Sequence, residues 1–403
     1  MGHKECGGVR GQIDDNGHMT HVMEQLEVDW KYSYGVQTAD NELLARIIVK
    51  EIFRLNGLEV SFQAKPVPGV AGRGENTHVG IAAKMKNGKV VNLFAPKDMH
   101  TEFLSAVGYG SMMGLLKNYE VINPFISSTI DSLNRLKPGF EAPVCIVTSL
   151  GLSPEVPSRN RTILAGLIRD IDSPMATRIE MRSPNPYTNT YLAIAAFYIS
   201  MLDGIKACVE SGKTLKEMEN ELSKKAGDEG FYLEKDREYR SEHDVFEDYN
   251  EEERAHLFGK PPATVWENMC AIKNYPEKIA VLTTGNILKK EFIESFAKGA
   301  LIRWQTELLN RIIPEYHKEI CLMKKLHDDD NHTTHDAAMW EKIAAMRNTM
   351  AKDVTEQPSL FTMTREAFAR GDFDAASNLQ LEMAEIMQKL KAQYNEYQHN
   401  IID

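Results

Sequence analysis

The 403-residue sequence lacks the usual features of exported, membrane-inserted or disulfide-bonded proteins. Its five cysteines are odd in number and widely spaced, which fits neither a disulfide framework nor a zinc site built from CxxC pairs. No uninterrupted apolar run reaches about 18 residues, and the first residues lack the charged-then-apolar order of a signal peptide. We therefore expect reduced thiols, a cytoplasmic location and no membrane partner.

A surplus of positive charge is also missing. Asp and Glu number 58 against 47 Lys and Arg, and the formal net charge is -11. Binding to nucleic acid needs a concentrated basic face, so this balance argues against nucleic acid as a main partner. The 42% hydrophobic content is enough for a substantial core in one large domain or in two or three ordinary ones.

The first third of the chain predicts a hairpin, strands and a helix that faces the core. An Asn-Gly pair at residues 16–17 is a strong hairpin signal. Apolar residues recur at helical spacing between residues 38 and 56, and Gly57 is placed to end that helix. Strands are expected at residues 9–13, 18–22, 24–30, 58–64, 79–85 and 89–95, and a second helix at residues 97–118.

The rest of the chain predicts loops that line a site, a buried helix and a C-terminal appendage. Residues 127–182 are rich in Pro, Arg and Ser and short on helical periodicity. Residues 189–209 are apolar almost all round, which is typical of a buried helix. We divide the chain into a catalytic-type domain (1–325), a linker (326–336) and a helical region (337–403). An apolar stripe from Leu379 to Tyr397 predicts packing or a short coiled coil, with partner binding as the alternative.

Several glutamates and one histidine have the chemistry of metal ligands. Magnesium prefers oxygen ligands and usually bridges carboxylates to substrate phosphates. Glu5 and Glu27 lie on expected strands, where each taken alone is more simply explained as a solvated residue. His78 ends a Gly-rich loop whose backbone can approach a ligand closely, and by itself it is more simply explained as a loop histidine bound to a carbonyl.

Two further segments carry charged residues in patterns that suit a phosphate or carboxylate site. Arg135 and Glu141 lie on a loop shaped by Pro and Gly, where a guanidinium fork binds an anion and a mobile carboxylate takes a proton, or the two form a salt bridge. Arg178, Glu180 and Arg182 alternate on an expected strand and so point to one face. A structural ladder of ion pairs is the alternative interpretation.

Taken in this order, the segments resemble the glutamine synthetase family over about residues 1–310. The strongest similarity is Arg-Ile-Glu-Met-Arg-Ser-Pro-Asn-Pro at residues 178–186, followed by Asn-Thr-Tyr-Leu and Leu-Asp-Gly-Ile. The loop from Lys65-Pro66 to His78 and the flap-like run from Asn134 to Pro143 also resemble the family pattern. The resemblance implies an α+β fold: a curved, mainly antiparallel sheet that forms part of a split barrel, backed by helices, with a helical C-terminal appendage.

The resemblance also implies ATP-dependent ligation of glutamate and ammonia through γ-glutamyl phosphate, in nitrogen assimilation. Glutamate and ammonia would be the substrates, ATP and Mg²⁺ or Mn²⁺ the cofactors, and a ring-shaped homo-oligomer the assembly. Glu5 and Glu27 would hold one metal ion, and His78 with Glu180 would help to hold the other.

The same resemblance assigns roles to the remaining candidates. Gly72, Arg135 and Arg182 would bind glutamate. Glu141 would cover the site and take a proton from the ammonium group, and Arg161 would neutralise the transferring phosphoryl group. ATP contacts would come from Arg161, Arg169 and Arg178.

The sequence departs from the family pattern in three places. His78 is followed by Val-Gly-Ile-Ala in place of His-x-His-x-Ser, and the residues after Arg161 read TILAGLIRD. An extra hairpin separates Glu5 from Glu27. We also expect the N-terminal β-grasp domain and the Glu-x-Glu strand of the family to be missing, which leaves the fold incomplete at the N-terminus. The alternatives are a catalytically incomplete scaffold or partner-binding subunit, and a glutamate–amine ligase.

Overall fold

The computed structural model divides the chain into two compact units. Unit 1 combines Met1–Pro261 with Asn274–Lys290, and unit 2 combines Pro262–Lys273 with Glu291–Asp403. The structure describes residues 2–4, 10–13, 19–66, 72–137, 145–328, 330, 332–355 and 357–401.

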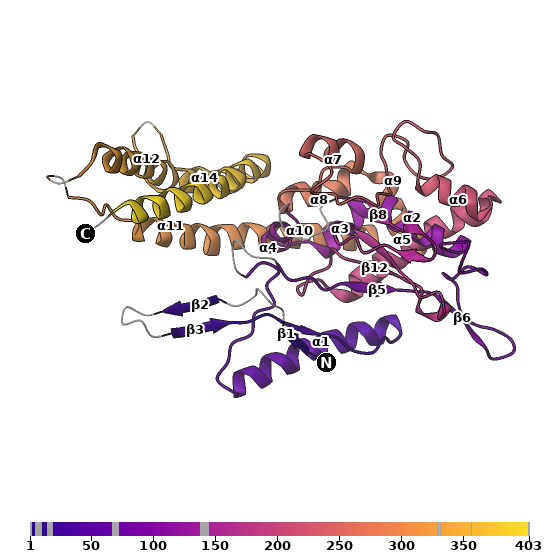
Figure 1. Cartoon of the computed structure of the whole chain (residues 1–403). Coiled ribbons are helices and arrows are strands. Elements are labelled where there is room, and N and C mark those ends of the chain that lie inside the picture. The colour runs from indigo at the N-terminus through magenta and orange to yellow at the C-terminus, as the bar shows by residue number, and fades with distance from the viewer. Residues whose placement is uncertain are drawn as a thin grey trace. The chain divides into compact units, whose positions relative to one another are not determined.

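Unit 1 mixes short strands with helices, as the expected α+β class requires (Figure 1). Its strands are β1 (Gly2–Lys4), β2 (Arg10–Ile13), β3 (Met19–Met23), β4 (Leu26–Val28), β5 (Thr77–Val79), β6 (Ala82–Lys84), β7 (Val90–Asn92), β8 (Thr148–Ser149), β9 (Gly151–Ser153), β10 (Val156–Pro157), β11 (Ala165–Ile168) and β12 (Arg178–Met181). Its helices are α1 (Gly35–Leu55), α2 (Ala106–Lys117), α3 (Tyr119–Ile126), α4 (Ile130–Arg135), α5 (Thr190–Ser211), α6 (Leu215–Leu222), α7 (Glu251–Phe258) and α9 (Pro276–Leu282), with 3-10 turns η1 (Pro174–Ala176) and η2 (Thr284–Asn286).

A four-stranded sheet in the order β5-β12-β11-β8 forms the centre of unit 1. Strand β12 runs antiparallel to both neighbours, and β8 joins β11 in parallel. The register places Glu180 opposite His78 on β5 and opposite Gly166 on β11. Three positions of interest on adjacent strands therefore lie in one row across the sheet.

Helices α2 and α5 pack closely because glycines remove side chains from their contact. A Cβ atom on Gly114 would collide with the carbonyl of Ser200, and one on Gly204 would collide with the carbonyl of Gly110. Helix α5 begins at the predicted place, where Asn189 caps it by accepting a hydrogen bond from the Leu192 N–H. Among the described helices, α5 alone is long and apolar enough to cross a membrane, and a buried core helix passes the same test.

A buried ion network joins α3, α9 and the segment before α7. Lys278 is only 2% exposed, and its Nζ lies 2.9 Å from a carboxylate oxygen of Glu120 and 2.7 Å from one of Glu234. Arg237 pairs with Glu120 at 2.5 Å and donates to the carbonyl of Phe258. The attraction of these carboxylates outweighs the effect of burial and holds the pKa of Lys278 above its ordinary value.

The local predictions in unit 1 are confirmed in part. Strands β2 and β3 form the expected hairpin, and β6 pairs with β7 as expected. Residues 58–64 form no strand, because the Gln63 N–H is bonded to the Ser61 hydroxyl and the Ala64 carbonyl accepts from the Arg73 N–H. The helix expected from residue 97 begins later, where the Ser105 side chain caps α2.

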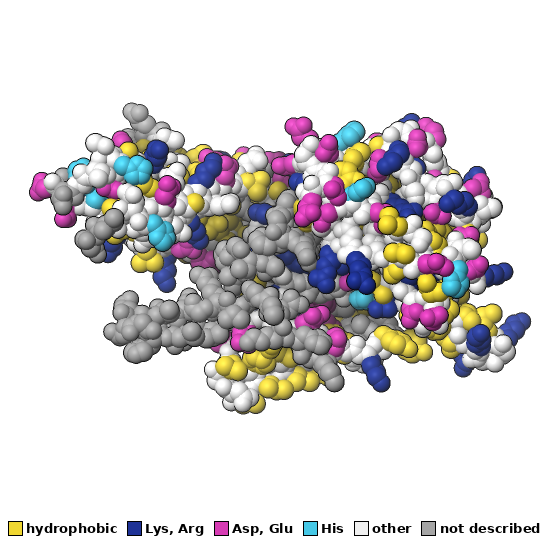
Figure 2. All heavy atoms as spheres, viewed as in Figure 1, with side chains coloured by type: hydrophobic (Ala, Val, Ile, Leu, Met, Phe, Trp, Pro, Cys, Tyr) yellow, Lys and Arg dark blue, Asp and Glu magenta, His cyan; other side chains and the backbone are white. Residues whose placement is uncertain are grey.

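Helix α1 forms where expected, but the prediction that its apolar face is buried in the core is wrong for the described structure. Six leucine and isoleucine side chains of α1 are 45–69% exposed, and Figure 2 shows hydrophobic side chains gathered over α1. These residues are Leu43, Leu44, Ile47, Ile48, Ile52 and Leu55. The opposite face, with Ala39 and Glu42, is the buried one. Helical periodicity identifies an apolar face without identifying what covers it.

Unit 2 is helical, and Figure 1 shows α12 and α14 side by side. Its helices are α8 (Val265–Asn274), α10 (Lys290–Glu307), α11 (Ile313–Leu322), α12 (Thr334–Ala351), α13 (Leu360–Ala369) and α14 (Phe373–Asn400), with a π turn, η3 (Leu308–Ile312), between α10 and α11. The boundary expected at residue 325 differs from this division, because the buried Trp304 of α10 packs on Phe368 and donates to Gln380 of α14 at 2.6 Å.

The C-terminal stripe is a packing surface, as predicted. Leu379, Met383, Leu390 and Tyr397 of α14 are buried. The expected linker connects two helices of the same unit. The first two backbone N–H groups of this linker, at residues 326 and 327, donate hydrogen bonds to the Tyr397 hydroxyl.

Candidate functional site

A pocket of about 260 Å³ opens over strands β11 and β12 in unit 1. Three arginines and one glutamate give its wall a positive balance, and Figure 2 shows Lys and Arg side chains gathered near this part of the unit. The lining residues are Ser149, Ser158, Arg159, Asn160, Arg161, Ile163, Gly166, Leu167, Ile168, Glu180 and Arg182. Such a wall suits an anionic ligand.

Glu180 is the acidic residue of this wall, and its carboxylate is held on two sides. Asn76 donates to one oxygen at 2.8 Å, and Arg182 donates to the other at 3.2 Å. Gly166 faces the same carboxylate across the sheet, where a Cβ atom would lie 3.4 Å from it. The charged face predicted for residues 178–182 is therefore present, with the intervening Ile179 fully buried.

Arg182 has one hydrogen-bond donor left over. Its Nε is buried and meets no acceptor among the residues that the structure describes. A buried N–H without an acceptor is costly, and a carboxylate or phosphate oxygen in the pocket would satisfy it.

His78 and Arg178 extend the row beyond Glu180. The Nε2 of His78 lies 3.9 Å from Glu180, and Arg178 donates from Nε to Nδ1 of His78 at 2.7 Å. Burial and the positive charges of Arg178 and Arg182 lower the pKa of His78, against the opposing effect of Glu180. The imidazole is therefore neutral, with its hydrogen assigned to Nε2 from the bond at Nδ1.

Arg135, a predicted glutamate ligand, does not line the pocket. It is 7% exposed and donates to the backbone carbonyls of Arg182 and Ser183, each at 3.0 Å. Burial lowers its pKa to about 10. Gly72 and Gly74 lie against this side chain, where a Cβ atom on either would collide with it. Arg135 thus supports the backbone that carries Arg182.

The other two arginines predicted to contact nucleotide lie in different places. Arg161 is exposed and lines the pocket. Arg169 is buried and donates to the carbonyls of Met99, Glu102 and Phe103 instead. Its guanidinium therefore holds the loop before α2, and the pocket wall lacks it.

The acidic metal candidates are not brought together in the described structure. Glu5 and Glu141 lie outside the described residues. Glu27 is exposed on β4, which pairs with β1. No group of three His, Cys, Asp or Glu side chains that could hold a metal ion occurs in the described part of the chain.

His78 and Glu180 fit one edge of a magnesium site. Mg²⁺ usually keeps several waters and takes one or two carboxylates together with substrate phosphates, so two protein ligands beside a basic pocket agree with its chemistry. Coordination by His78 requires a nitrogen free of its hydrogen, so Arg178 has to leave Nδ1 or the hydrogen has to move.

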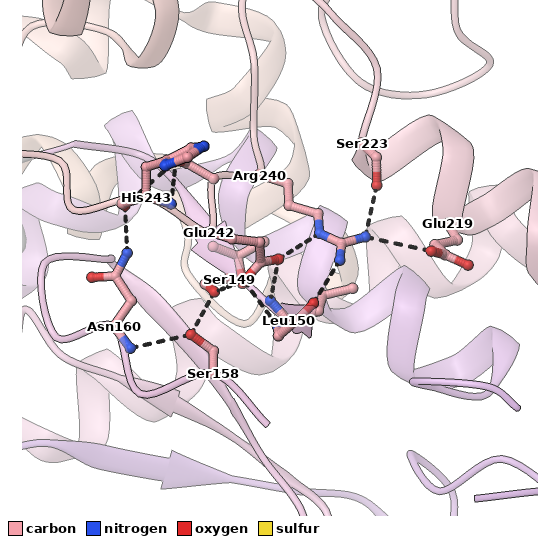
Figure 3. Close-up of polar contacts among 12 residues, drawn as sticks. Ser149, Leu150, Ser158, Asn160, Glu219, Ser223, Arg240, Glu242 and His243 are labelled. Carbon is pink, nitrogen blue, oxygen red and sulfur yellow. Dashed lines mark hydrogen bonds and ion pairs between the residues drawn. The ribbon is translucent and has the colours of Figure 1, made fainter. Parts of the chain in front are cut away.

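Sequence reasoning missed four residues of this region. Asn76 holds Glu180, Arg159 lines the pocket, and Glu242 with Ser149 anchors the pocket wall, as Figure 3 shows for the last two. Arg159 could have been found from its neighbour Arg161. Nothing in the sequence pairs Glu242 with Ser149, because 93 positions separate them.

Comparisons with known proteins show which family the sequence resembles. A sequence model of the glutamine synthetase catalytic domain matches residues 12–231, more than half of the chain. A glutamine synthetase of Clostridium saccharobutylicum is 36% identical over 186 residues, which cover 45% of this chain and 38% of the relative. One of Pyrococcus horikoshii is 33% identical over 205 residues, which cover 51% of this chain and 42% of the relative.

The fold is also similar to that of a solved glutamine synthetase. The cryo-EM structure of the Plasmodium falciparum enzyme matches with a TM-score of 0.50 and 21% identity, over 73% of this chain and 55% of that one. The chain spans about two fifths of the length of the two sequence relatives above. With the domain match over more than half of its residues, the chain belongs to the glutamine synthetase family.

Proposed function

We propose that this chain takes part in ATP-dependent ligation of glutamate and ammonia, through γ-glutamyl phosphate, to give glutamine. The observation that supports this most directly is the pocket lined by Arg159, Arg161, Arg182 and Glu180. The Nε2 atom of His78 lies 3.9 Å from Glu180. Phosphoryl transfer depends mainly on positioning and charge stabilisation, which arginines and a divalent cation supply.

The arginines of the pocket act on charge in this proposal. Arg161 neutralises the transferring phosphoryl group, and the buried Nε of Arg182 donates to an oxygen of the acyl group or phosphate. Arg178 binds nucleotide once it leaves His78, and Arg169 acts indirectly by holding the loop before α2.

The remaining roles are those that the resemblance to the family implies. His78 and Glu180 would help to hold one magnesium or manganese ion, and Glu5 with Glu27 would hold the other. Such ions would neutralise phosphate oxygens as negative charge develops. Arg135 and Gly72 would shape the glutamate site, and Glu141 would take the proton from ammonium.

The wider features of the proposal concern assembly and location. The expected form is a cytoplasmic homo-oligomeric ring. In that form the sheet would be part of a split barrel, as in the family fold. A catalytically incomplete scaffold or partner-binding subunit is the second candidate, because Arg135 and Arg169, two of the predicted ligand-binding arginines, donate to backbone carbonyls instead of lining the pocket.

Phosphate release from ATP tests the proposal. The purified chain is incubated with glutamate and magnesium, with and without ammonia or hydroxylamine, beside Glu180→Gln and the control Glu59→Gln, an exposed residue. We expect ammonia-dependent release that Glu180→Gln abolishes and Glu59→Gln preserves. If neither this chain nor a form that carries the N-terminal family segment releases phosphate, the proposed enzymatic function is contradicted and the incomplete subunit is favoured.

A further inference from the structure

Residues 149–161, called the strap below, carry two of the three pocket arginines. The strap contains the short β9–β10 hairpin and ends with Arg159 and Arg161, whose side chains are exposed at the pocket. Gly151 adopts a φ of +104°, and a Cβ atom there would collide with the Val156 carbonyl. The start of the strap is therefore tightly bent, and something has to satisfy its backbone N–H groups.

Glu242 meets the backbone N–H groups at this bend (Figure 3). Its carboxylate accepts the N–H of Gly151 at 2.9 Å and that of Leu150 at 3.2 Å, and it accepts the Ser149 hydroxyl. Arg240 adds an N–H from its Nε at 2.8 Å. Four donors converge on one carboxylate, an arrangement that needs its ionised form.

The charge of Glu242 agrees with that geometry. Burial acts to raise the pKa of Glu242, but the hydrogen bonds from Ser149, Arg240 and Gly151 outweigh it, so the pKa lies below its ordinary value. Arg240 is itself fixed, because it donates to the Gly151 carbonyl at 3.0 Å and to the Ser223 hydroxyl at 3.0 Å.

A chain of hydrogen bonds leads from Glu242 to the arginines. The Ser149 and Ser158 hydroxyl oxygens lie 2.5 Å apart, and the Asn160 N–H donates to the Ser158 hydroxyl at 3.2 Å. The Asn160 carboxamide donates to the carbonyl of His243, the residue after Glu242, at 2.7 Å. The residues on both sides of Arg159 are thus tied to one short segment, and Asn160 directly precedes Arg161.

We propose that Glu242 is a positioning residue that fixes the strap so that Arg159 and Arg161 face the phosphate groups of a bound nucleotide. Glu242 itself does not line the pocket and acts through Ser149, Ser158 and the strap backbone. The identity of the ligand rests on the proposed function above, whereas the anchoring of the strap does not.

A second glutamate of unit 1 supplies a matched control. Glu221 is buried and accepts the backbone N–H groups of residues 231, 232 and 233 at 2.9, 3.1 and 2.7 Å. It has the same chemistry as Glu242 and no contact with the strap or the pocket lining. If Glu242 had a purely structural role, Glu221→Gln and Glu242→Gln would change the affinity for MgATP by the same factor.

The experiment compares hydrogen exchange and MgATP binding in the full chain. Glu242→Gln turns an amide N–H₂ toward donors, Ser149→Ala breaks the link to Ser158 without removing a buried charge, and Glu242→Asp retains the charge. Because Glu242→Gln removes the charge on which four donors converge, we expect hydrogen exchange over residues 149–161 to rise by about tenfold or more in this variant. The Kd for MgATP, measured by calorimetry, should rise by a similar factor, with smaller changes in the other two variants.

The control variant and the wild type separate the outcomes. Glu221→Gln should raise exchange near residues 231–233 and leave the Kd for MgATP within about twofold of wild type. Unchanged exchange in the strap of Glu242→Gln, or an equal rise in Glu221→Gln, overturns the positioning role, as does faster strap exchange with unaltered MgATP affinity. A wild-type chain that binds no MgATP counts against the proposed function, and the exchange comparison then decides the anchoring of the strap alone.

Discussion

Glu75 should make the stability of unit 1 depend on pH between about 5 and 9. Its carboxylate lies 3.0 Å from Arg46 of α1 and 3.5 Å from the Thr190 hydroxyl that begins α5. Glu42 pairs with the same arginine and accepts from Thr190 at 3.1 Å. A buried carboxylate, that of Glu42, and a half-buried one, that of Glu75, thus share one guanidinium, which also donates to the carbonyl of Thr188.

The size of the effect follows from the pKa. Burial, and then the like charge of Glu42, raise the pKa of Glu75 from 4.5 to about 8, whereas Arg46 and Thr190 lower it. The folded state therefore holds a proton that the unfolded state has released. This contribution to stability is complete below pH 4.5 and is lost as the pH rises through 8. The interval of about 3.5 pH units sets an upper limit of about 5 kcal/mol.

Glu75→Gln keeps the shape of the protonated acid and removes its titration. Its amide oxygen can accept from Arg46 while its N–H₂ group faces Glu42 and Thr190. We expect the variant to match wild type near pH 5 and to be more stable at pH 9 by about 3–5 kcal/mol. Urea unfolding at one-unit pH intervals measures the difference, with hydrogen exchange over residues 35–55 as a local readout.

Two results decide this prediction. The control Glu59→Gln removes an exposed carboxylate from the segment after α1 and should follow the wild-type pH curve. A stability difference between Glu75→Gln and wild type that stays constant from pH 5 to pH 9 would refute the account of Glu75.

Three further predictions test the packing. Lys278→Met removes a buried ammonium group from two half-buried carboxylates, Glu120 and Glu234. We expect the free energy of unfolding to fall by about 3 kcal/mol in urea titrations, and a loss below about 1 kcal/mol contradicts the network. Gly204→Ala places a methyl group against the carbonyl of Gly110, so the thermal midpoint of unit 1 should fall, and an unchanged midpoint argues against close α2–α5 packing. Leu390→Ala should lower the free energy of unfolding by about 2–5 kcal/mol, because Leu390 is fully buried. Ile47→Gln changes an exposed residue and should leave this free energy within about 0.5 kcal/mol of wild type. Equal losses in urea unfolding would contradict the difference in burial between the two positions.

Much of the local structure could be predicted because the signals are short-range. The Asn-Gly hairpin, the alternation of residues 178–182 and the apolar helix after Asn189 all depend on side chains within a few positions of one another. Residues 58–64 show the limit of such signals. They have the composition of a strand, but their hydrogen bonds go to local side chains and to the Gly-rich loop.

The sequence predicted which charged residues belong to the candidate site better than it predicted their hydrogen-bond partners. Glu180 and Arg182 lie on one face of β12, as the alternation predicted, and His78 lies near Glu180, as the family resemblance implied. The directions of Arg135 and Arg169 could not be predicted, because their acceptors are backbone carbonyls more than 45 positions away in the chain.

Residue order was enough to predict the family, most of the local elements and the charged row on β12, because these depend on neighbouring positions and on the two-residue repeat of a strand. Long-range packing sets which face of α1 is buried, which arginines reach the pocket and that Glu242 accepts from the strap backbone. The physical reason is that a buried charge takes whatever donor or acceptor the fold brings within about 3 Å, and long-range packing makes that choice.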